Sequence, residues 1–407
     1  MLPKTADAVV IGGGVLGTSA AFHLANSGVQ NIVLMDRGPI ASGTTPFAAG
    51  QTGYLNNDRF ALKFGAYCVE FFENFEKLTG QRIDFHQCGS FRVSLTEKYQ
   101  ADLDNRIAAA KELGDTVDMI SHDRARQLVP TFNPPDGSQV LLIPRDGYVE
   151  PKSVAVAYAA AAVSRGVNIR THINATGLDV ANGQVKGVKT SEGVIETNWV
   201  VLAAGAWTRQ FGQGLGLNLH TIPVRHQAYV TAPLPHVLST QPIVRVTESQ
   251  IYVRQEAAGL LVGGYGFRPL SFDMNEFPSD FEIPGLPADP VYFRQLADAA
   301  TQFFPSLAEA VVIQERRGLP TVSPDGRLLV SESKQVRGLV VASACGVGGI
   351  DRSPGVGRVV ADVVTGREPW LDPAVLNVER FGDEYAADAG LRVRCEHVYA
   401  HQYHDIY

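Results

Sequence analysis

The first 36 residues contain apolar segments with the lengths of a strand, a helix and a second strand. Residues 8–11 form a short apolar run with β-branched side chains, which is typical of a buried parallel strand. Apolar residues then recur at helical spacing from residue 15 to residue 26, and residues 32–35 form a second apolar run. The pattern therefore predicts a strand, a helix and a second strand.

A glycine-rich turn joins the first predicted strand to the helix. Gly12, Gly14 and Gly17 have the spacing GxGxxG, and Asp36 follows the second strand. Glycines let the backbone turn tightly and approach a pyrophosphate, which the helix N-terminus then faces with its partial positive charge. Asp36 lies where a carboxylate accepts hydrogen bonds from an adenosine ribose. The unit predicts dinucleotide binding, but by itself it does not decide between FAD and NAD.

The segment at residues 41–50 is rich in small and hydroxyl side chains. Short hydrogen-bond donors and an approachable backbone suit a pyrophosphate and a ribityl chain, but an ordinary polar loop has the same composition. Both interpretations are open at this point.

The rest of the chain alternates helical and strand patterns without internal repeats. Helical spacing covers residues 60–78, 98–113, 154–164 and 291–304. Strand patterns cover residues 91–95, 169–180, 184–190, 228–231, 251–254 and 260–262. Asn182 and Gly183 predict a hairpin turn, and the proline-rich residues 277–290 predict a surface loop.

The composition narrows the classes of protein. The chain has 407 residues, of which 45% are hydrophobic and 19% charged, and its net charge is −7. These values exclude a disordered or collagen-like chain, and the acidic balance argues against nucleic acid as a partner. The four cysteines are scattered, and the apolar runs are too short to cross a bilayer. We expect a cytoplasmic protein without disulfides and without a membrane segment.

Five segments carry a resemblance to a known family: residues 36–45, 200–207, 223–227, 318–326 and 345–357. Together they resemble the amine- and amino-acid-oxidising flavoproteins of the D-amino acid oxidase superfamily, and within it the dimethylglycine and sarcosine dehydrogenase/oxidase group. The tail from residue 380 resembles the end of the oxidase module in that group, whose longer members continue into a folate-binding region.

The resemblance implies FAD as the cofactor and a set of residues that contact it. These residues are Gly12, Gly14, Val15, Leu16, Gly17, Asp36, Arg37, Ser42, Gly43, Thr44, Thr45, Ala49, Gly50, Gln51, Ala204, Gly205, Trp207, Gly346, Gly348, Gly349 and Ile350. Two positions depart from the family. Phe47 stands where the longer members have a histidine that bonds covalently to the flavin. Gly318 stands approximately where monomeric sarcosine oxidases have a flavin-bonding cysteine. We therefore expect non-covalent FAD.

His226 and Tyr252 are the candidate catalytic residues. The resemblance places an active-site histidine at His226, although a lone histidine in a strand is more commonly structural. Tyr252 lies in the next predicted strand, where tyrosine commonly serves in packing. A shift of one residue in the register would turn its side chain to the other face of the sheet.

Arg254 and Asp351 are the candidate substrate-binding residues. A guanidinium suits a planar carboxylate, and Arg254 shares a strand face with Tyr252. Asp351 stands approximately where the resemblance places a lysine that helps to bind the carboxylate of sarcosine. A carboxylate at this position would repel a substrate carboxylate and attract an ammonium group. The alternative is that Asp351 lies on the surface while Arg352 points inward.

No metal site is expected from the ten histidines. His397, His401 and His404 share one helical face, which favours a polar or interface helix over a metal site.

The expected fold is α/β, with a doubly wound, Rossmann-like FAD-binding domain and an inserted substrate domain built on a mixed or antiparallel sheet. We assign residues 1–83, 147–222 and 326–370 to the FAD-binding domain and residues 84–146 and 223–325 to the substrate domain. Residues 371–407 form a C-terminal helical extension in this scheme.

The expected function is FAD-dependent oxidation of a C–N bond in a small secondary or tertiary amine or an N-methyl amino acid. Hydride passes to flavin N5, and the imine is then hydrolysed. The alternatives are oxidation of a D-amino acid, an imino acid or a 2-hydroxy acid, and a flavin-binding subunit that needs a partner. The electron acceptor is oxygen or a redox partner. The oligomeric state, monomer or homo-oligomer, is open.

Overall fold

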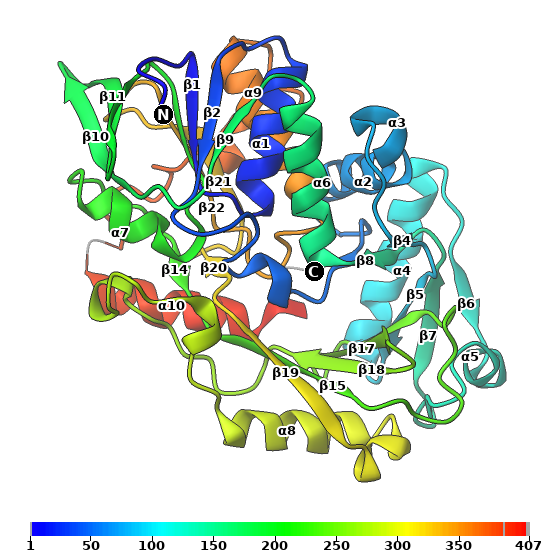
Figure 1. Cartoon of the computed structure of the whole chain (residues 1–407). Helices are drawn as coiled ribbons and strands as arrows, with labels where there is room; N and C mark the ends of the chain where they lie inside the picture. Colours follow the sequence, from blue (N-terminus) through cyan, green and yellow to red (C-terminus); the bar gives the residue numbers. More distant parts are fainter. Residues whose placement is uncertain (1, 386, 404–407) are drawn as a thin grey trace.

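A computed structural model describes residues 2–385 and 387–403 (Figure 1). Its first layer is a six-stranded sheet in which β21 is antiparallel to β22 and the other strands are parallel. The strands, in spatial order, are β21 (Leu329–Glu332), β22 (Leu339–Ser343), β13 (Val200–Leu202), β1 (Ala8–Ile11), β2 (Ile32–Met35) and β9 (Asn168–Arg170).

Different structures cover the two faces of this sheet (Figure 1). The helices α1 (Val15–Asn26), α6 (Pro151–Val163) and α9 (Ser353–Thr365) pack on one face, where Val10, Leu34 and Phe22 belong to one core cluster. The small sheet of β10 (Ala175–Ala181), β11 (Gln184–Thr190) and β12 (Gly193–Glu196) packs on the other, where Val9 and Val33 belong to a second cluster. The expected Rossmann-like unit is confirmed, with a β-sheet in place of helices on its second face.

The second layer is a mixed sheet of eight strands. In spatial order they are β19 (Val312–Gly318), β15 (His226–Thr231), β18 (Gly259–Gly264), β17 (Ile251–Glu256), β16 (Ile243–Val246), β5 (Ser90–Ser94), β7 (Gln139–Ile143) and β6 (Asp118–Ile120). Its residues alternate between the two faces, because Phe91 and Val93 enter the core beneath α8 (Pro290–Thr301) while Arg92 points the other way. The polar face of this sheet is turned toward the first layer.

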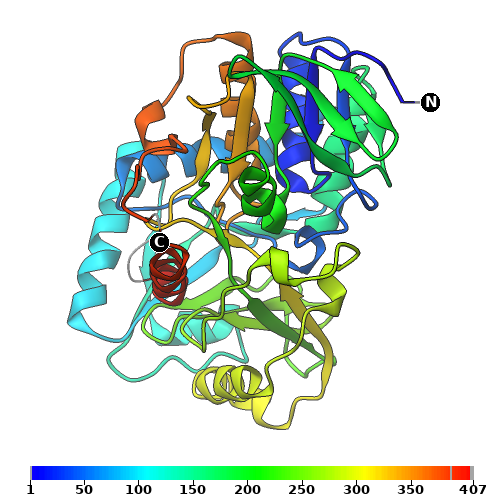
Figure 2. The ribbon, with the colours of Figure 1, turned by 90° about the vertical axis from the view of Figure 1, so that its left-hand side faces the viewer.

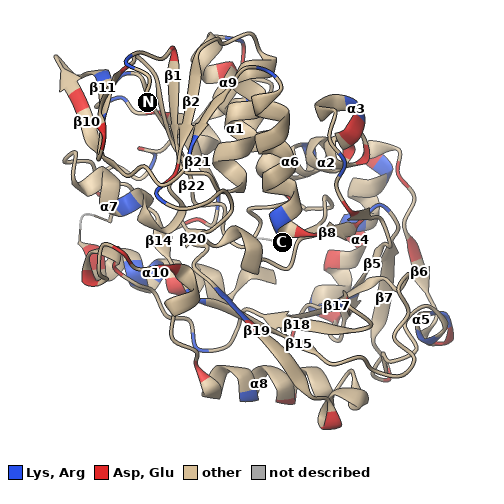
Figure 3. Ribbon diagram, in the orientation of Figure 1, with Lys and Arg blue, Asp and Glu red and all other residues tan. Residues whose placement is uncertain are grey.

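The other helices and strands connect the two layers. They are β3 (Gln51–Thr52), α2 (Arg59–Glu73), α3 (Phe75–Thr79), β4 (Phe85–His86), α4 (Glu97–Leu113), α5 (His122–Leu128), β8 (Gly147–Val149), α7 (Thr208–Gln213), β14 (Ile222–Pro223), β20 (Thr321–Val322) and α10 (Asp388–Ala400). Figure 2 shows α10 end-on, beside the region where the layers meet. Figure 3 shows Lys and Arg interspersed with Asp and Glu over the described part of the chain.

Two predicted elements differ from the observed ones. The predicted helix at residues 60–78 is interrupted at Asn74, where α2 ends and α3 begins. The predicted strand at residues 169–180 is two strands, because β9 pairs with β2 in the large parallel sheet and β10 pairs with β11 in the small one. The predicted turn between β10 and β11 is confirmed, since Asn182 and Gly183 have φ angles of 53° and 69°.

The two sheets draw on separate stretches of the chain. Strands of the eight-stranded sheet come from residues 90–143 and 226–318, and those of the six-stranded sheet come from residues 8–35, 168–202 and 329–343. We keep the division of the chain given above as a proposal for the domain boundaries. None of the helices in the described residues combines the length and the apolar character that crossing a membrane requires.

Candidate functional site

A long cavity of about 870 Å³ begins at the ends of β1 and β2 and reaches the eight-stranded sheet. Asp36 and Arg37 line one end of it, and His226 and Tyr252 line the part next to the second sheet. The cavity therefore lies at the carboxyl ends of parallel strands, where ligands bind in open α/β sheets.

The glycine-rich turn at this cavity depends on close backbone contacts. Gly12 has a φ of +113°, and a Cβ atom there would lie 2.3 Å from the carbonyl oxygen of Ala203. A Cβ atom on Gly17 would lie 1.8 Å from the carbonyl oxygen of Gly12, so Gly17 lets α1 pack against the turn. Thr45 accepts a hydrogen bond from the amide of Val15 at 3.1 Å. The turn and the start of α1 are thus held against the cavity wall.

Asp36 and Arg37 lie at the far end from His226. The Asp36 carboxylate accepts hydrogen bonds from the amides of Gly13 (2.6 Å) and Gly38 (2.7 Å), and its burial raises its pKa. Arg37 lies 4.0 Å above the ring of Trp207. It also donates hydrogen bonds to the carbonyl oxygens of Ser279 and Phe281, which belong to the predicted surface loop.

That loop is a wall of the long cavity, a role that its proline-rich sequence does not indicate. Residues 277–280, 282 and 283 line the cavity. Residues 173–177, at and just before the start of β10, line it as well, and no motif in the sequence marks them.

Two tyrosines and one histidine form a hydrogen-bond network next to the second sheet. His226 Nε2 lies 2.8 Å from the hydroxyl oxygen of Tyr252, and His226 Nδ1 lies 2.8 Å from that of Tyr399 on α10. A neutral imidazole has one donor and one acceptor nitrogen, so it accepts from one tyrosine and donates to the other. Burial lowers the pKa of His226 to about 4, so the ring is neutral at pH 7.

The sheet register explains how Tyr252 reaches His226. Tyr252 on β17 pairs with Gly263 on β18, and Gly263 pairs with Ala228 on β15. A Cβ atom on Gly263 would lie 2.1 Å from the Tyr252 hydroxyl oxygen, so the ring lies across β18 in the space that this glycine leaves. The structure thus brings together the two candidate catalytic residues.

Tyr265 is a site residue that the sequence analysis missed. Its ring centroid lies 5.3 Å from that of His226, and it lines both the long cavity and a second cavity. It follows β18 by one residue and lies beyond the predicted strand at residues 260–262, so no pattern in the sequence marked it.

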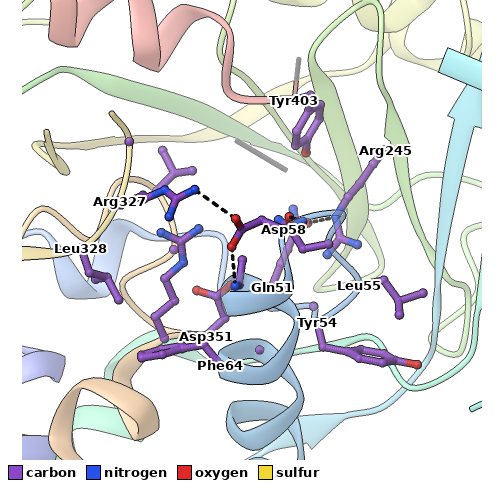
Figure 4. Close-up of a pocket in the computed structure, with 18 of the residues that line it drawn as sticks. Gln51, Tyr54, Leu55, Asp58, Phe64, Arg245, Arg327, Leu328, Asp351 and Tyr403 are labelled. Atoms are coloured by element: carbon purple, nitrogen blue, oxygen red, sulfur yellow. Dashed lines mark hydrogen bonds and ion pairs between the residues drawn. The ribbon is translucent and has the colours of Figure 1, made fainter. Parts of the chain in front are cut away.

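The second cavity, which we call the arginine chamber, has a volume of about 700 Å³ (Figure 4). It shares residues 48, 49, 265, 347 and 350 with the long cavity, so the two meet there. Its charged lining residues are Asp58, Arg92, Asp102, Asp146, Arg245, Asp325, Arg327, Asp351, Arg352 and Arg394.

Most charges in the arginine chamber are paired within the protein. Arg245 donates to Asp146 at 2.6 Å and to Gln51 at 2.8 Å, and Arg327 pairs with Asp58 at 3.0 Å, as Figure 4 shows. Asp351 is buried, and its Oδ1 has no hydrogen-bond partner. Burial raises the pKa of Asp351 to about 6, against the opposing effect of Arg352 and Arg245. The structure therefore places Asp351 inside the chamber and not on the surface.

Arg254 does not fit the expected carboxylate clamp. Its guanidinium pairs with Glu256 at 2.5 Å and donates to the carbonyl oxygens of Ala49 (2.8 Å) and Gln255 (2.7 Å). All three of its nitrogens are engaged, and its side chain is not among the lining residues of either cavity. Arg254 instead fixes the backbone of Ala49 at the point where the cavities meet.

The expected FAD contacts divide between the two cavities. Gly50, Gln51 and Gly348 line the arginine chamber and not the long cavity, and Gly17 acts through packing. The other expected contacts line the long cavity; they are Gly12, Gly14, Val15, Leu16, Asp36, Arg37, Ser42, Gly43, Thr44, Thr45, Ala49, Ala204, Gly205, Trp207, Gly346, Gly349 and Ile350.

The residues of the long cavity fit FAD. An added Cβ on Gly43 or Gly205 would meet no atom within 4 Å, so the backbone is open to a close-lying ligand. Hydroxyl side chains and the start of α1 lie between Asp36 at one end and His226 at the other. A long dinucleotide with a central pyrophosphate and a ring system at each end matches this order of groups.

The histidines near the C-terminus carry no metal site in the described part of the chain. The rings of His397 and His401 stack at 4.1 Å, and His404 lies outside the described residues. No cluster of three or more His, Cys, Asp or Glu among the described residues is arranged to hold a metal ion.

Known proteins with similar sequences include dehydrogenases and oxidases of N-methylated amino acids. The chain is 32% identical to mitochondrial dimethylglycine dehydrogenase of Mus musculus over 391 residues, covering 93% of this chain and 44% of that protein. It is 28% identical to 4-methylaminobutanoate oxidase (formaldehyde-forming) of Paenarthrobacter nicotinovorans, over 93% of this chain and 46% of that protein. The chain thus spans less than half of the length of these relatives.

Solved structures of other proteins have the same fold as this chain. L-proline dehydrogenase from P. horikoshii superposes with a TM-score of 0.82 at 23% identity, covering 94% of this chain and 99% of the other. Glycine oxidase from Geobacillus kaustophilus superposes with a TM-score of 0.77 at 24% identity, covering 92% and 98%. Residues 7–363 match the family model described as FAD dependent oxidoreductase, DAO, and the chain therefore belongs to this family of FAD-dependent oxidoreductases.

Proposed function

We propose that this chain oxidises a C–N bond of a small secondary or tertiary amine or an N-methyl amino acid, of the kind represented by sarcosine and dimethylglycine. The observation that carries the proposal is the His226 network. It lies at the end of the long cavity, which we call the FAD cavity from here on, beside the arginine chamber. The dimethylglycine dehydrogenase and 4-methylaminobutanoate oxidase relatives support an N-methyl substrate.

Bound FAD supplies an acceptor for a hydride from the carbon next to the amine nitrogen. The amine must lose its proton first, because only its lone pair drives hydride loss. An amine with a pKa near 10 is mostly protonated at pH 7, so reaching the neutral form costs about 4 kcal/mol. The oxidised substrate is an imine, which takes up water and separates into an aldehyde and an amine that is shorter by the lost group.

His226 serves to hold the neutral amine. With its pKa lowered to about 4, it is a weak base. Its two ring nitrogens bond Tyr252 and Tyr399 and so fix these side chains, and a tyrosine hydroxyl of the network then meets the amine as a hydrogen-bond partner. Positioning of this kind aligns the C–H bond and excludes water from the reacting atoms.

FAD is held without a covalent bond in this proposal. A Cβ atom on Gly318 would lie 3.8 Å from the Cβ atom of Phe47, so the two positions that carry flavin-bonding nucleophiles elsewhere form one inert patch of the wall. Cys345 also lines the cavity, but burial raises the pKa of its thiol to about 11, which keeps it protonated. We predict that denaturing the purified yellow protein with acid or guanidinium releases all its FAD. Flavin absorbance that stays with the precipitated chain would contradict this.

A flavin-binding subunit without its own activity is the second candidate. It is favoured by a relative named pyruvate dehydrogenase phosphatase regulatory subunit, from Mus musculus, which is 28% identical over 97% of this chain and 45% of that protein. D-amino acids, imino acids and 2-hydroxy acids are the other substrate classes that this scaffold accommodates.

One experiment separates these candidates. The isolated chain is mixed anaerobically with N-methyl amines, D-amino acids, prolines and 2-hydroxy acids, and bleaching of the flavin absorbance is recorded. Rapid bleaching by an N-methyl amine supports the proposal, and bleaching only by another class replaces it. Failure of every compound favours the subunit. Repeating the active reaction with oxygen or an artificial acceptor distinguishes an oxidase from a dehydrogenase, and cell fractionation tests the cytoplasmic location.

A further inference from the structure

The arginine chamber contains a buried cation that the protein leaves incompletely bonded. Arg92, on β5, is 4% exposed, and neither its Nε nor its Nη1 has a hydrogen-bond partner. The neighbouring arginines differ from it, because Arg106 donates to Asp102 and to the carbonyl oxygen of Leu55, and Arg245 is neutralised by Asp146. A buried guanidinium with unused donors is costly unless it meets an anion.

Arg92 lies at a defined position in the row of side chains that crosses the second sheet. Tyr252 pairs with Arg245, and Arg245 pairs with Arg92, so all three side chains stand on the same face. The Tyr252 hydroxyl lies over Gly263 on β18, and β5 is three strands away. Neighbouring strands are about 4.8 Å apart. The backbone of Arg92 therefore lies roughly 14 Å, measured along the sheet, from the Tyr252 hydroxyl that bonds His226.

The chamber is lined by groups of opposite charge that lack hydrogen-bond partners. Asp351 follows Ile350, which belongs to the zone shared with the FAD cavity, and its Oδ1 is unpartnered; Figure 4 labels Asp351 among the lining residues. The guanidinium of Arg92 lies 4.9 Å from the ring of Tyr403. Arg92 and Asp351 line the same cavity, so a donor group and an acceptor atom without partners are open to one ligand.

We propose that the arginine chamber binds an N-methyl amino acid lengthwise, with its carboxylate on Arg92 and its amine beside Asp351 and the His226 network. The inference rests on the proposed function and names its substrate class, an amino acid whose carboxylate and amine are separated by a spacer. An α-amino acid such as sarcosine, which the proposed function includes, fits this arrangement less well than an amino acid with a spacer, since its carboxylate would lie next to the amine and therefore next to Asp351.

The test uses the FAD-loaded protein and a series of N-methyl compounds. Sarcosine, 3-(methylamino)propanoate and 4-(methylamino)butanoate lengthen the spacer, and N-methylbutylamine lacks the carboxylate. We expect kcat/KM of the wild type to rise along the series of three acids. A wild type that prefers sarcosine tenfold over 4-(methylamino)butanoate overturns the proposal.

Two substitutions test the carboxylate contact and the amine contact of the proposal separately. Arg92→Gln should lower kcat/KM for 4-(methylamino)butanoate about 10- to 100-fold, the effect of losing a charge-assisted hydrogen bond, and should leave N-methylbutylamine within twofold. Asp351→Asn should weaken use of N-methylbutylamine and leave binding of sodium pentanoate, which has no amine, within twofold. Arg126→Gln, an exposed arginine paired with Asp123, is the matched control and should change none of these values. Equal losses for all compounds in Arg92→Gln would contradict the anchor.

Binding of sodium pentanoate gives a readout that does not depend on turnover. Calorimetry should show a dissociation constant that Arg92→Gln raises about 10- to 100-fold and that Arg92→Lys raises less, because lysine keeps the charge. If no amine is oxidised but pentanoate binding depends on Arg92, the proposed function fails and the anchor stands. If Arg92→Gln does not fold, the proposal is tested by the kcat/KM series of the wild type and by pentanoate binding to Arg92→Lys. Pentanoate binding that is equal in wild type and both variants overturns the proposal.

Discussion

The two adjoining cavities are built in different ways. The FAD cavity is formed largely by backbone and small residues, several of them within the first 50 positions, and its geometry depends on glycines such as Gly12 and Gly17. The arginine chamber is lined by large charged side chains from at least six separate segments, most of which are paired within the protein. If FAD and the substrate bind as we propose, the cofactor is recognised through local backbone shape, while the substrate meets the charges that distant segments leave unpaired.

The largest effect is expected at the junction of the cavities. Replacing His226 by Gln should slow flavin reduction by the true substrate about 10²- to 10⁴-fold, because the amine loses its positioning partner, and should leave FAD content unchanged. Stopped-flow absorbance and the flavin-to-protein ratio measure the two quantities. Reduction within twofold of the wild type would make His226 a structural residue of the Tyr252–Tyr399 network.

Next is the backbone of the FAD cavity. Gly17→Ala places a Cβ atom against the Gly12 carbonyl oxygen, which is rigid backbone, so we expect a loss of about 3 kcal/mol in unfolding free energy together with weak FAD binding. Denaturant unfolding and flavin content measure these effects. Gly28→Ala is the matched control, because Gly28 has a positive φ but space for a Cβ atom. Its loss of unfolding free energy should come from backbone strain alone and be about 1 kcal/mol. Equal losses at both positions would show that close packing at Gly17 is unimportant.

A smaller effect is expected at the far end of the FAD cavity. Asp36→Ala removes the acceptor for the amides of Gly13 and Gly38 and, in the proposed FAD site, for the ribose, and should weaken FAD binding by roughly 1–3 kcal/mol. Asp36→Asn, which keeps one acceptor oxygen, should lose less. Titration of the apoprotein with FAD provides the dissociation constants. An unchanged constant for Asp36→Ala would remove Asp36 from the ribose site.

The pH dependence of unfolding measures the stability cost of the buried Asp351 carboxylate in the chamber. The pKa of Asp351 is about 6 in the folded protein and 3.8 in its ordinary range, so between these values the folded state binds more protons than the unfolded state. Stability contributed by this group therefore falls as pH rises from about 4 to about 6. Asp351→Asn should be more stable than the wild type by at most about 3 kcal/mol above pH 6, with the difference vanishing near pH 4.

Two histidines with lowered pKa values also make stability depend on pH, so the variant must be compared with the wild type at each pH. Burial lowers the pKa values of His23 and His226 to about 4, so their contributions rise with pH between about 4 and 6.5, opposite in sign to that of Asp351. They are common to both proteins and cancel in the difference. A difference independent of pH would mean that Asp351 does not titrate in this window.

Local sequence determined the parts of this protein whose geometry depends on near neighbours. The strand, glycine turn, helix, strand and acid of residues 8–36 were all predicted, because β-branched runs, a GxGxxG spacing and a following carboxylate have few alternative structures. The resemblance supplied the family and pointed to His226. The hydrogen bond between His226 and Tyr252, by contrast, required the register of β15, β18 and β17 and the missing side chain of Gly263.

Only the tertiary structure decided which charges are used up and which are left for a ligand. Arg254 and Arg92 look equally suitable in the sequence, since both are arginines in alternating strands. Folding places Glu256 and the Ala49 carbonyl against Arg254, whereas it buries Arg92 with two unpartnered nitrogens. The partner of a charged side chain depends on segments that lie far away in the chain, and a local pattern of polar and apolar residues carries no information about them.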